Sequence, residues 1–115
     1  MSEPKQTNVD DFVGELEAGI FKERLAIMLT EAALGAVMHN RKGKVNVSFD
    51  ITRVNESGQV MICANLKNSK PTKRGTITEE VKSDTPMWVG KGGVITIEQP
   101  KEELNGQFTL IHSSN

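Results

Sequence analysis

The distribution of apolar residues divides the chain into a helical part and a sheet part. Between residues 12 and 37, apolar side chains recur at three- and four-residue steps, which is the period of an amphipathic helix. The stripe is formed by Phe12, Val13, Leu16, Ile20, Phe21, Leu25, Met28, Leu29, Ala32, Ala36 and Val37. Because Gly19 interrupts this pattern, we expect either a short helix followed by a longer one or a single helix kinked near Gly19.

Short polar residues and glycine mark the expected ends of the helical part, residues 10–40. Asp10 or Asp11 is a suitable N-cap, because a short carboxylate accepts hydrogen bonds from the first backbone N–H groups of a helix. Asn40 and Gly43 are typical of a helix C-terminus. The first nine residues have no packing pattern, and we expect them to form a mobile tail.

From Lys44 the apolar period changes to two, which predicts an antiparallel sheet over residues 44–98. The alternating runs 45–51 and 60–66 flank the turn sequence "NESG" and predict a hairpin. "TITEEVK" predicts a third strand, and "PMWVGKGGVITIE" predicts two short strands around a glycine-rich turn. The polar residues 100–115 are expected to form a loose tail.

These elements predict an α+β fold, in which an N-terminal helix packs on an antiparallel β-meander of four to five strands. A chain of 115 residues has the length of a single domain. It has one cysteine, Cys63, and no apolar run of the about 20 residues that cross a bilayer. Its N-terminus is polar. We therefore expect a cytoplasmic protein that does not contact a membrane.

The net charge of −1 conceals an uneven distribution of charge along the chain. Residues 41–74 carry eight basic and two acidic side chains, whereas acidic side chains outnumber basic ones before and after them. In the predicted hairpin, Lys44 begins the first strand and Lys67 ends the second, so antiparallel pairing places them side by side. The segment Lys67–Gly75 is expected to be an extended, flexible finger outside the sheet, since Pro71 cannot donate to a ladder.

One end of the sheet would then present a positively charged edge that attracts polyanions. The predicted nucleic-acid-binding residues are Arg41, Lys42, Lys44, Lys67, Lys70, Lys73 and Arg74. An alternative explanation is that these lysines only keep the protein soluble and prevent edge-to-edge pairing. The sequence does not distinguish DNA from RNA.

No residue pattern in the chain predicts catalysis, a metal site or a cofactor site. His39 lies at the expected helix end and His112 near the C-terminus, and neither has a neighbouring carboxylate or cysteine pattern. Cys63 is expected to pack, and Glu79 and Glu80 point to opposite faces of a strand. The stretch "WVGKGGVIT" departs from a phosphate-binding loop and is followed by a strand. We therefore expect a protein that is not an enzyme.

Two further surfaces could contact proteins. A helix face with Glu15, Glu23 and Glu31 could mimic phosphate and engage a basic partner, although a solvated helix face is the better explanation of these residues. The sheet face away from the helix carries apolar groups that a homodimer could bury, namely Met61, Cys63, Ile95 or Ile97. Aromatic residues are too few for a base-stacking platform, since only Trp88 and Phe108 lie outside core positions.

Residues 12–98 resemble small uncharacterised proteins encoded in bacteriophage and prophage early regions. The resemblance is carried by "LTEAALGAVMHNRKGKVNVSFDI", "KPTKRG" and "DTPMWVGKGG". It implies a role in phage DNA replication or recombination, or interference with host machinery, and it carries no catalytic residue.

Two hypotheses follow from these observations. The first is a non-enzymatic phage or prophage accessory protein that binds nucleic acid through the basic sheet edge and loop. The second is a protein-binding inhibitor or adaptor that acts on a host defence or replication protein.

Overall fold

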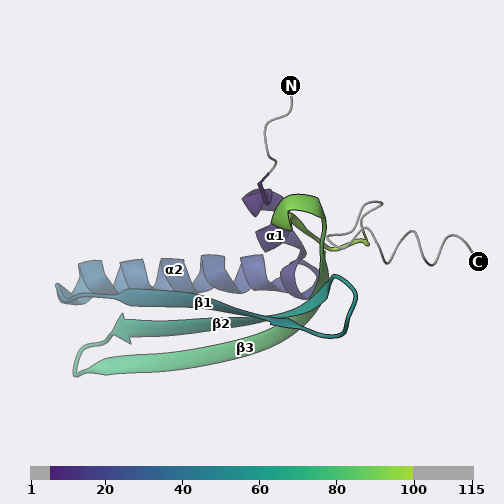
Figure 1. Cartoon of the computed structure of the whole chain (residues 1–115). Coiled ribbons are helices and arrows are strands. Elements are labelled where there is room, and N and C mark those ends of the chain that lie inside the picture. The colour runs from purple at the N-terminus through teal and green to yellow at the C-terminus, as the bar shows by residue number, and fades with distance from the viewer. Residues whose placement is uncertain (1–5, 100–115) are drawn as a thin grey trace, which may run out of the picture.

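A computed structural model describes residues 6–99, which form a four-stranded antiparallel sheet with helices on one face (Figure 1). The helical part comprises α1 (Val9–Glu15), a 3₁₀ turn (Leu16–Gly19) and α2 (Ile20–His39). The strands β1 (Lys44–Arg53), β2 (Gln59–Pro71), β3 (Thr76–Val89) and β4 (Ile95–Thr96) pair in sequence order. The predicted α+β fold is confirmed.

The helical part is split where the sequence predicted it. Glu17, Ala18 and Gly19 all have positive φ angles, of 53°, 54° and 91°, so the helical part is kinked before α2 begins. The predicted cap was wrong: Asn8 caps α1, since its side-chain oxygen accepts a hydrogen bond from the Asp11 amide at 3.0 Å. The two aspartates instead occupy the first turn, where carboxylates favour the positive end of the helix dipole. At the other end, Asn40 adopts the left-handed conformation and stops α2.

The central hairpin is longer than the sequence indicated. β2 runs to Pro71, and β3 begins at Thr76, so most of the segment expected to be a flexible finger is part of the ladder. Only a tight turn remains outside, closed by a hydrogen bond from the Thr72 amide to the Gly75 carbonyl. β3 also continues through Trp88 into the glycine-rich turn, so the sheet has four strands in the described part of the chain. The predictions for the C-terminal tail, Phe108 and His112 concern positions outside the described residues.

The core lies between α2 and alternate residues of β2. Side chains of α1 and α2 pack on this row of β2 residues. The ring of Phe49, on β1, contacts the rings of Phe12 and Phe21, with centroid distances of 5.2 and 5.8 Å. The buried apolar residues are Leu16, Phe21, Met28, Ala32, Val60, Ile62, Ala64, Leu66 and Met87. The predicted helix stripe was partly wrong, because Ile20, Leu29 and Val37 are 43%, 52% and 82% exposed.

The core is concentrated near α1, and we call this end of the sheet the packed half. The other end, from Asn68 of β2 to the turn at Gly75, is the tip half. There α2 approaches the hairpin closely: a Cβ on Gly35 would lie 2.7 Å from the Pro71 carbonyl oxygen. Asn68 is fully buried beneath α2, and neither atom of its amide has a hydrogen-bond partner in the described structure.

Candidate nucleic-acid interface

The two basic segments meet at the end of the tip half. Arg41, in the loop after α2, donates hydrogen bonds from its guanidinium to the carbonyl oxygens of Thr72 and Gly75, the second at 2.7 Å. The Thr72 hydroxyl in turn accepts a hydrogen bond from the Gly75 amide at 3.1 Å. Loops more than 30 residues apart in the sequence are therefore joined by one side chain.

We call the five cations of these loops the basic tip: Arg41, Lys42, Lys44, Lys73 and Arg74. All five are exposed, and residues 40–44 and 71–76 contain no carboxylate. Lys44 lies across from Ser69 rather than from Lys67, because β2 extends further than expected. The predicted convergence of the two basic segments is present in the structure, although the register differs by two residues.

Two of the seven predicted binding residues stand apart from the basic tip. Lys67 pairs across the ladder with Glu80, which also accepts a hydrogen bond from Asn65 at 2.9 Å. Lys70 lies on the helix side of the sheet, in an ion pair of 3.4 Å with Glu31. Nearby carboxylates thus reduce the attraction of these two lysines for an anion.

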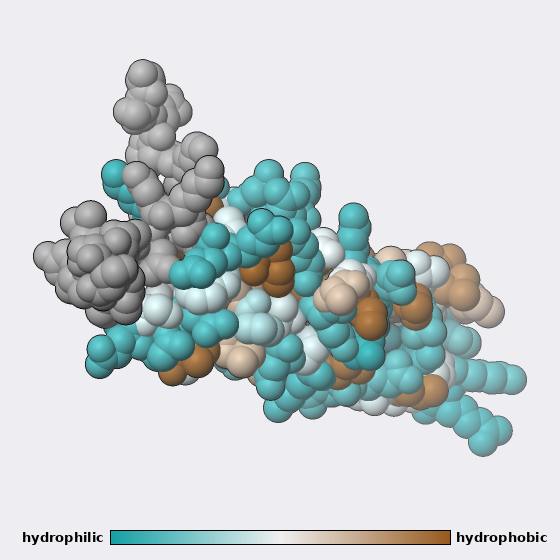
Figure 2. All heavy atoms as spheres, turned by 90° about the vertical axis from the view of Figure 1, so that its right-hand side faces the viewer, coloured by the Kyte–Doolittle hydropathy of each residue, from teal (hydrophilic) through white to brown (hydrophobic). Residues whose placement is uncertain are grey.

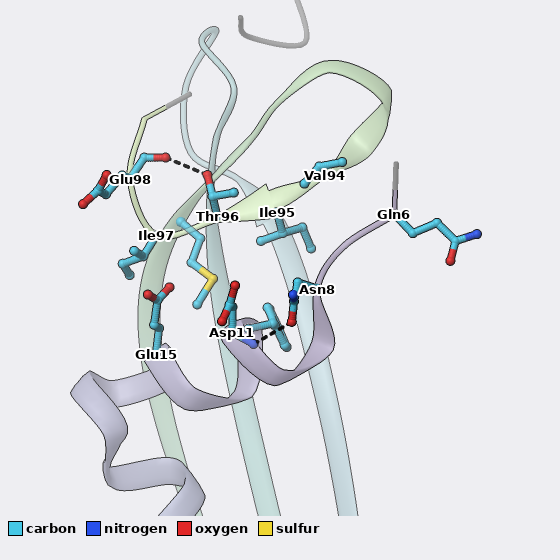
Figure 3. A pocket seen from close by; sticks show the side chains of 11 residues that line it. Gln6, Asn8, Asp11, Glu15, Val94, Ile95, Thr96, Ile97 and Glu98 are labelled. Atoms are coloured by element: carbon cyan, nitrogen blue, oxygen red, sulfur yellow. Dashed lines mark hydrogen bonds between the residues drawn. The ribbon is translucent and has the colours of Figure 1, made fainter. Parts of the chain in front are cut away.

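The opposite end of the molecule carries a cleft of about 540 Å³ between α1 and β4 (Figure 3). Its floor includes Phe12, Met87 and Ile95, and its charged lining residues are the carboxylates Asp11, Glu15 and Glu98. The charged groups that line this cleft are therefore opposite in sign to those of the basic tip. Ile95 and Ile97 pack against the core and line this cleft, so the prediction that they lie on the open sheet face was wrong.

The acidic residues expected to form one helix face are separated in the structure. Glu15 belongs to α1, on the other side of the kink, and Glu31 is paired with Lys70. Of these three residues, only Glu23 is an exposed carboxylate on α2, where it lies in the first turn. The acidic helix face proposed as a protein-binding surface is therefore not formed.

Cys63 lies half-buried on the open face of the sheet, between Asp50 and Asp84 of the neighbouring strands. Its hydrogen bond with Asp84 raises the pKa of the thiol, and partial burial and the negative charges of Asp84 and Asp50 act in the same direction. At a given pH this thiol therefore has a smaller thiolate population, and is less reactive, than an unperturbed cysteine. Among residues 6–99, no group of three or more His, Cys, Asp or Glu side chains is placed to hold a metal ion.

An apolar surface on α2 is the feature that the sequence pattern missed. Because apolar residues surround the whole helix, no period in the sequence shows which of them face water. Six large apolar side chains of α2 are exposed, and Figure 2 shows hydrophobic groups at the surface between hydrophilic ones. They are Ile20, Ile27, Leu29, Leu34, Val37 and Met38.

Comparison with known families gives a match to the YfdP family over residues 8–95. The chain belongs to the YfdP family. The Escherichia coli (strain K12) protein with the name "Uncharacterized protein YfdP" is 37% identical over 111 residues, which cover 96% of this chain and 89% of that protein. The matched range of the YfdP family includes both the basic tip and the packed half.

No solved structure matches this YfdP family member. None of the helices in residues 6–99 has the length and apolar character needed to span a bilayer.

Proposed function

We propose that this protein is a non-enzymatic accessory protein that binds the phosphate backbone of nucleic acid through the basic tip. The observation that supports this proposal most strongly is the pair of Arg41 hydrogen bonds, which join two cationic loops without an intervening carboxylate. Exposed lysine and arginine side chains contact phosphate without reading sequence. This mode of binding needs no base-stacking aromatic residues, and none lies in either loop.

The proposed setting is phage or prophage DNA replication or recombination in the cytoplasm of the bacterial host. The resemblance to early-region proteins supports this setting, and the charge of the basic tip supports a polyanionic ligand. If all five cations contact phosphates, the logarithm of the binding constant should fall with the logarithm of salt concentration with a slope of about −4.5 for duplex DNA.

The direct experiment is fluorescence-anisotropy titration of a labelled 20-base-pair duplex at increasing salt concentration, repeated with single-stranded DNA and with RNA. We expect binding at about 50 mM salt that weakens steeply toward about 200 mM. The variant Lys73→Ala/Arg74→Ala should bind at least tenfold more weakly, and its salt slope should be smaller by about 2. The absence of binding by the wild-type protein at low salt would remove the proposal.

A matched control is Lys22→Ala/Lys82→Ala, which removes the same charge from α2 and the middle of β3. Its affinity should stay within about twofold of the wild-type value, since neither residue belongs to the basic tip. Equal weakening in the two double variants would show that net charge, and not the basic tip, determines binding.

The exposed apolar residues of α2 support a second candidate function, that of an inhibitor or adaptor that binds a host or phage protein. Ile20, Ile27, Leu34 and Met38 follow one another at helical spacing on one flank of α2, with exposures between 43% and 66%. Exposed apolar patches commonly mark contacts between proteins. Capture of a host protein from nuclease-treated lysate by the wild-type chain, and its loss with Leu34→Glu, would favour this function.

A further inference from the structure

The outer edge of β1 is a row of unpaired backbone groups. Among residues 6–99, β1 pairs with β2 alone, and the Val54 amide donates to the Gln59 carbonyl where the hairpin begins. Because ladder bonds alternate along an antiparallel strand, the even-numbered residues of β1 bond to β2 and the odd-numbered residues direct N–H and C=O outward. The outward residues are Val45, Val47, Phe49, Ile51 and Arg53.

Apart from Arg53, the side chains of these outward residues are apolar and partly exposed. Val47, Phe49 and Ile51 lie across from the buried Leu66, Ala64 and Ile62, so they occupy the face that α2 covers. They remain 40%, 38% and 53% exposed because α2 lies mainly over β2. A strand edge of this kind is a template for pairing with another strand.

The other edge of the sheet is protected against pairing. On β3 the Val89 amide donates to Gly58 of the β1–β2 turn, so the even-numbered residues of β3 direct their backbone groups outward. These include the charged Glu80, Lys82 and Asp84, together with Pro86, which has no N–H. Charges and proline are common devices against edge pairing. β1 has neither proline nor lysine between Val45 and Thr52.

One flank of α2 extends the apolar surface of β1. Gly35 lies against Pro71 of β2, and Ala32, three residues earlier, lies against Gly43 just before β1. The next residue of the same helical row is Leu29, which therefore lies beyond β1 and is 52% exposed. We call Leu29, Val47, Phe49 and Ile51 the β1 wall.

We propose that a second copy of this chain occupies the β1 wall, so that the two β1 strands pair antiparallel across a two-fold axis and form a continuous eight-stranded sheet. Antiparallel pairing between the β1 strands of two copies is compatible with the two-fold symmetry of a dimer. Either of two registers pairs nine residues of each strand. A register centred on Ser48 places Val47 opposite Phe49, and one centred on Phe49 places Val47 opposite Ile51. In both registers Asp50 lies opposite a neutral side chain. This inference does not depend on the proposed function.

The dimensions of the β1 wall suit a dimer. Nine paired residues span about 30 Å, and one sheet with one helical layer is roughly 20 Å thick, which gives on the order of 600 Å² from each protomer. Stable interfaces begin near 1,200 Å² in total, about 600 Å² from each partner. The two basic tips lie at opposite ends of such a dimer, with the Lys44 residues about 27–34 Å apart. This distance exceeds the Debye length of about 8–10 Å, so the tips do not repel each other appreciably.

The test is sedimentation equilibrium of the full chain at concentrations from about 1 to 100 µM, alongside two matched pairs of variants. We expect a mass of twice 12.6 kDa for the wild-type protein at the highest concentration. Ile51→Lys should raise the dissociation constant at least tenfold, whereas Ile77→Lys should not, although Ile77 is a similarly exposed residue of β3. Leu29→Glu and Leu34→Glu form the second pair, on opposite flanks of α2, and only Leu29→Glu should weaken the dimer.

Circular dichroism identifies any variant that fails to fold, and the surface substitution Leu29→Glu gives a reading even if Ile51→Lys unfolds. Hydrogen exchange supplies an independent measurement: the Val47, Phe49 and Ile51 amides should exchange at least tenfold more slowly in the dimer than in diluted monomer. A wild-type monomer at about 100 µM overturns the proposal. It is also overturned if Leu34→Glu and Ile77→Lys dissociate the dimer while the β1-wall variants leave it intact, or if these amides are already protected in a monomer.

Discussion

The packed half and the tip half share the same three long strands, yet they are held together differently. In the packed half, Leu16, Phe21 and Met87 are almost completely excluded from water, and α1 closes the end of the sheet (Figure 1). In the tip half, close backbone contact and the Arg41 hydrogen bonds join α2 to the hairpin. The charges also differ, with carboxylates around the cleft and cations at the basic tip. The apolar core and the cations of the basic tip therefore lie at opposite ends of the sheet.

The largest effect is expected from truncation of the core in the packed half. Ile62 is fully buried between Ile51 and Thr85, so Ile62→Ala should lower the free energy of unfolding by about 2–5 kcal/mol. Ser69→Ala, in the tip half of the same strand, should change it by less than about 0.5 kcal/mol. Urea denaturation followed by circular dichroism measures both values. Similar losses for the two variants would contradict the proposed division of stability.

A second prediction tests the close contact in the tip half. A Cβ on Gly35 would meet the Pro71 backbone, so Gly35→Ala should destabilise the protein by about 1–3 kcal/mol although alanine favours helix. Gly14 in α1 has no such neighbour within 4 Å, and Gly14→Ala should stabilise it by up to about 1 kcal/mol. The opposite signs are measurable as shifts of the thermal midpoint. A stabilising Gly35→Ala would show that α2 can move away from the hairpin at little cost.

The sequence predicted the elements of the fold better than it predicted their contacts. The alternation of residues in β1 and β2, and the break in the helical part near Gly19, follow from local periods and backbone preferences, and the structure confirms both. Which side of α2 faces the sheet could not be predicted, because a helix that is apolar on all sides has no preferred buried stripe in its sequence. Leu29 and Val37 were assigned to the core for this reason and are exposed.

For the candidate site, too, the sequence predicted the segments that take part better than it predicted the contacts of their side chains. Charge counting located the basic segments, and hairpin pairing predicted that they meet. Their separation into five tip residues and two lysines with carboxylate neighbours depends on contacts between distant residues. The ion pair of Lys70 with Glu31 joins β2 to α2 and has no local signal in the sequence.

The third prediction concerns the buried amide of Asn68. Both polar atoms lack partners among the described residues, and a buried polar group without a hydrogen bond costs about 1–3 kcal/mol. Asn68→Leu should therefore raise the free energy of unfolding by about 1 kcal/mol, because it replaces an unpartnered amide in the tip half with an apolar side chain like those of the packed half. Chemical denaturation tests this expectation. A loss of stability would show that the amide is satisfied in solution, for example by a buried water molecule.

A fourth, smaller effect is expected at Arg41. Arg41→Lys keeps the positive charge but replaces the planar guanidinium, whose Nη2 donates to both carbonyls, with a shorter-reaching ammonium, so the cost should be about 0.5–1.5 kcal/mol. The Thr72 and Gly75 amides should exchange hydrogen faster, while amides of the packed half should be unchanged. Nuclear magnetic resonance measures this exchange for each residue. Unchanged exchange in the turn would mean that Arg41 does not fix its conformation.

The smallest expected effect uses cysteine chemistry to compare the electrostatic environment of the two halves. The pKa of Cys63 is raised by its hydrogen bond with Asp84, by partial burial and by the charges of Asp84 and Asp50, whereas Lys82 acts in the opposite direction. Alkylation requires the thiolate, whose population falls when the pKa rises. At about pH 8, iodoacetamide should therefore modify Cys63 more slowly than an unperturbed cysteine, whose pKa is about 8.5. Asp84→Asn should increase the rate, and the difference should disappear as the pH rises above the raised pKa.

The matched probe in the tip half is Ser69→Cys in a Cys63→Ser background. Position 69 lies on the same face of β2 but across from Lys44, in place of the carboxylate neighbours of Cys63. Nearby cations stabilise a thiolate, so this cysteine should react faster than Cys63 at the same pH, and added salt should reduce the difference. Mass spectrometry of the alkylated protein measures both rates. Equal rates at low salt would show that the cations of the tip half are too dispersed to stabilise a single anionic atom together. That result would also weaken the case for phosphate binding at the basic tip.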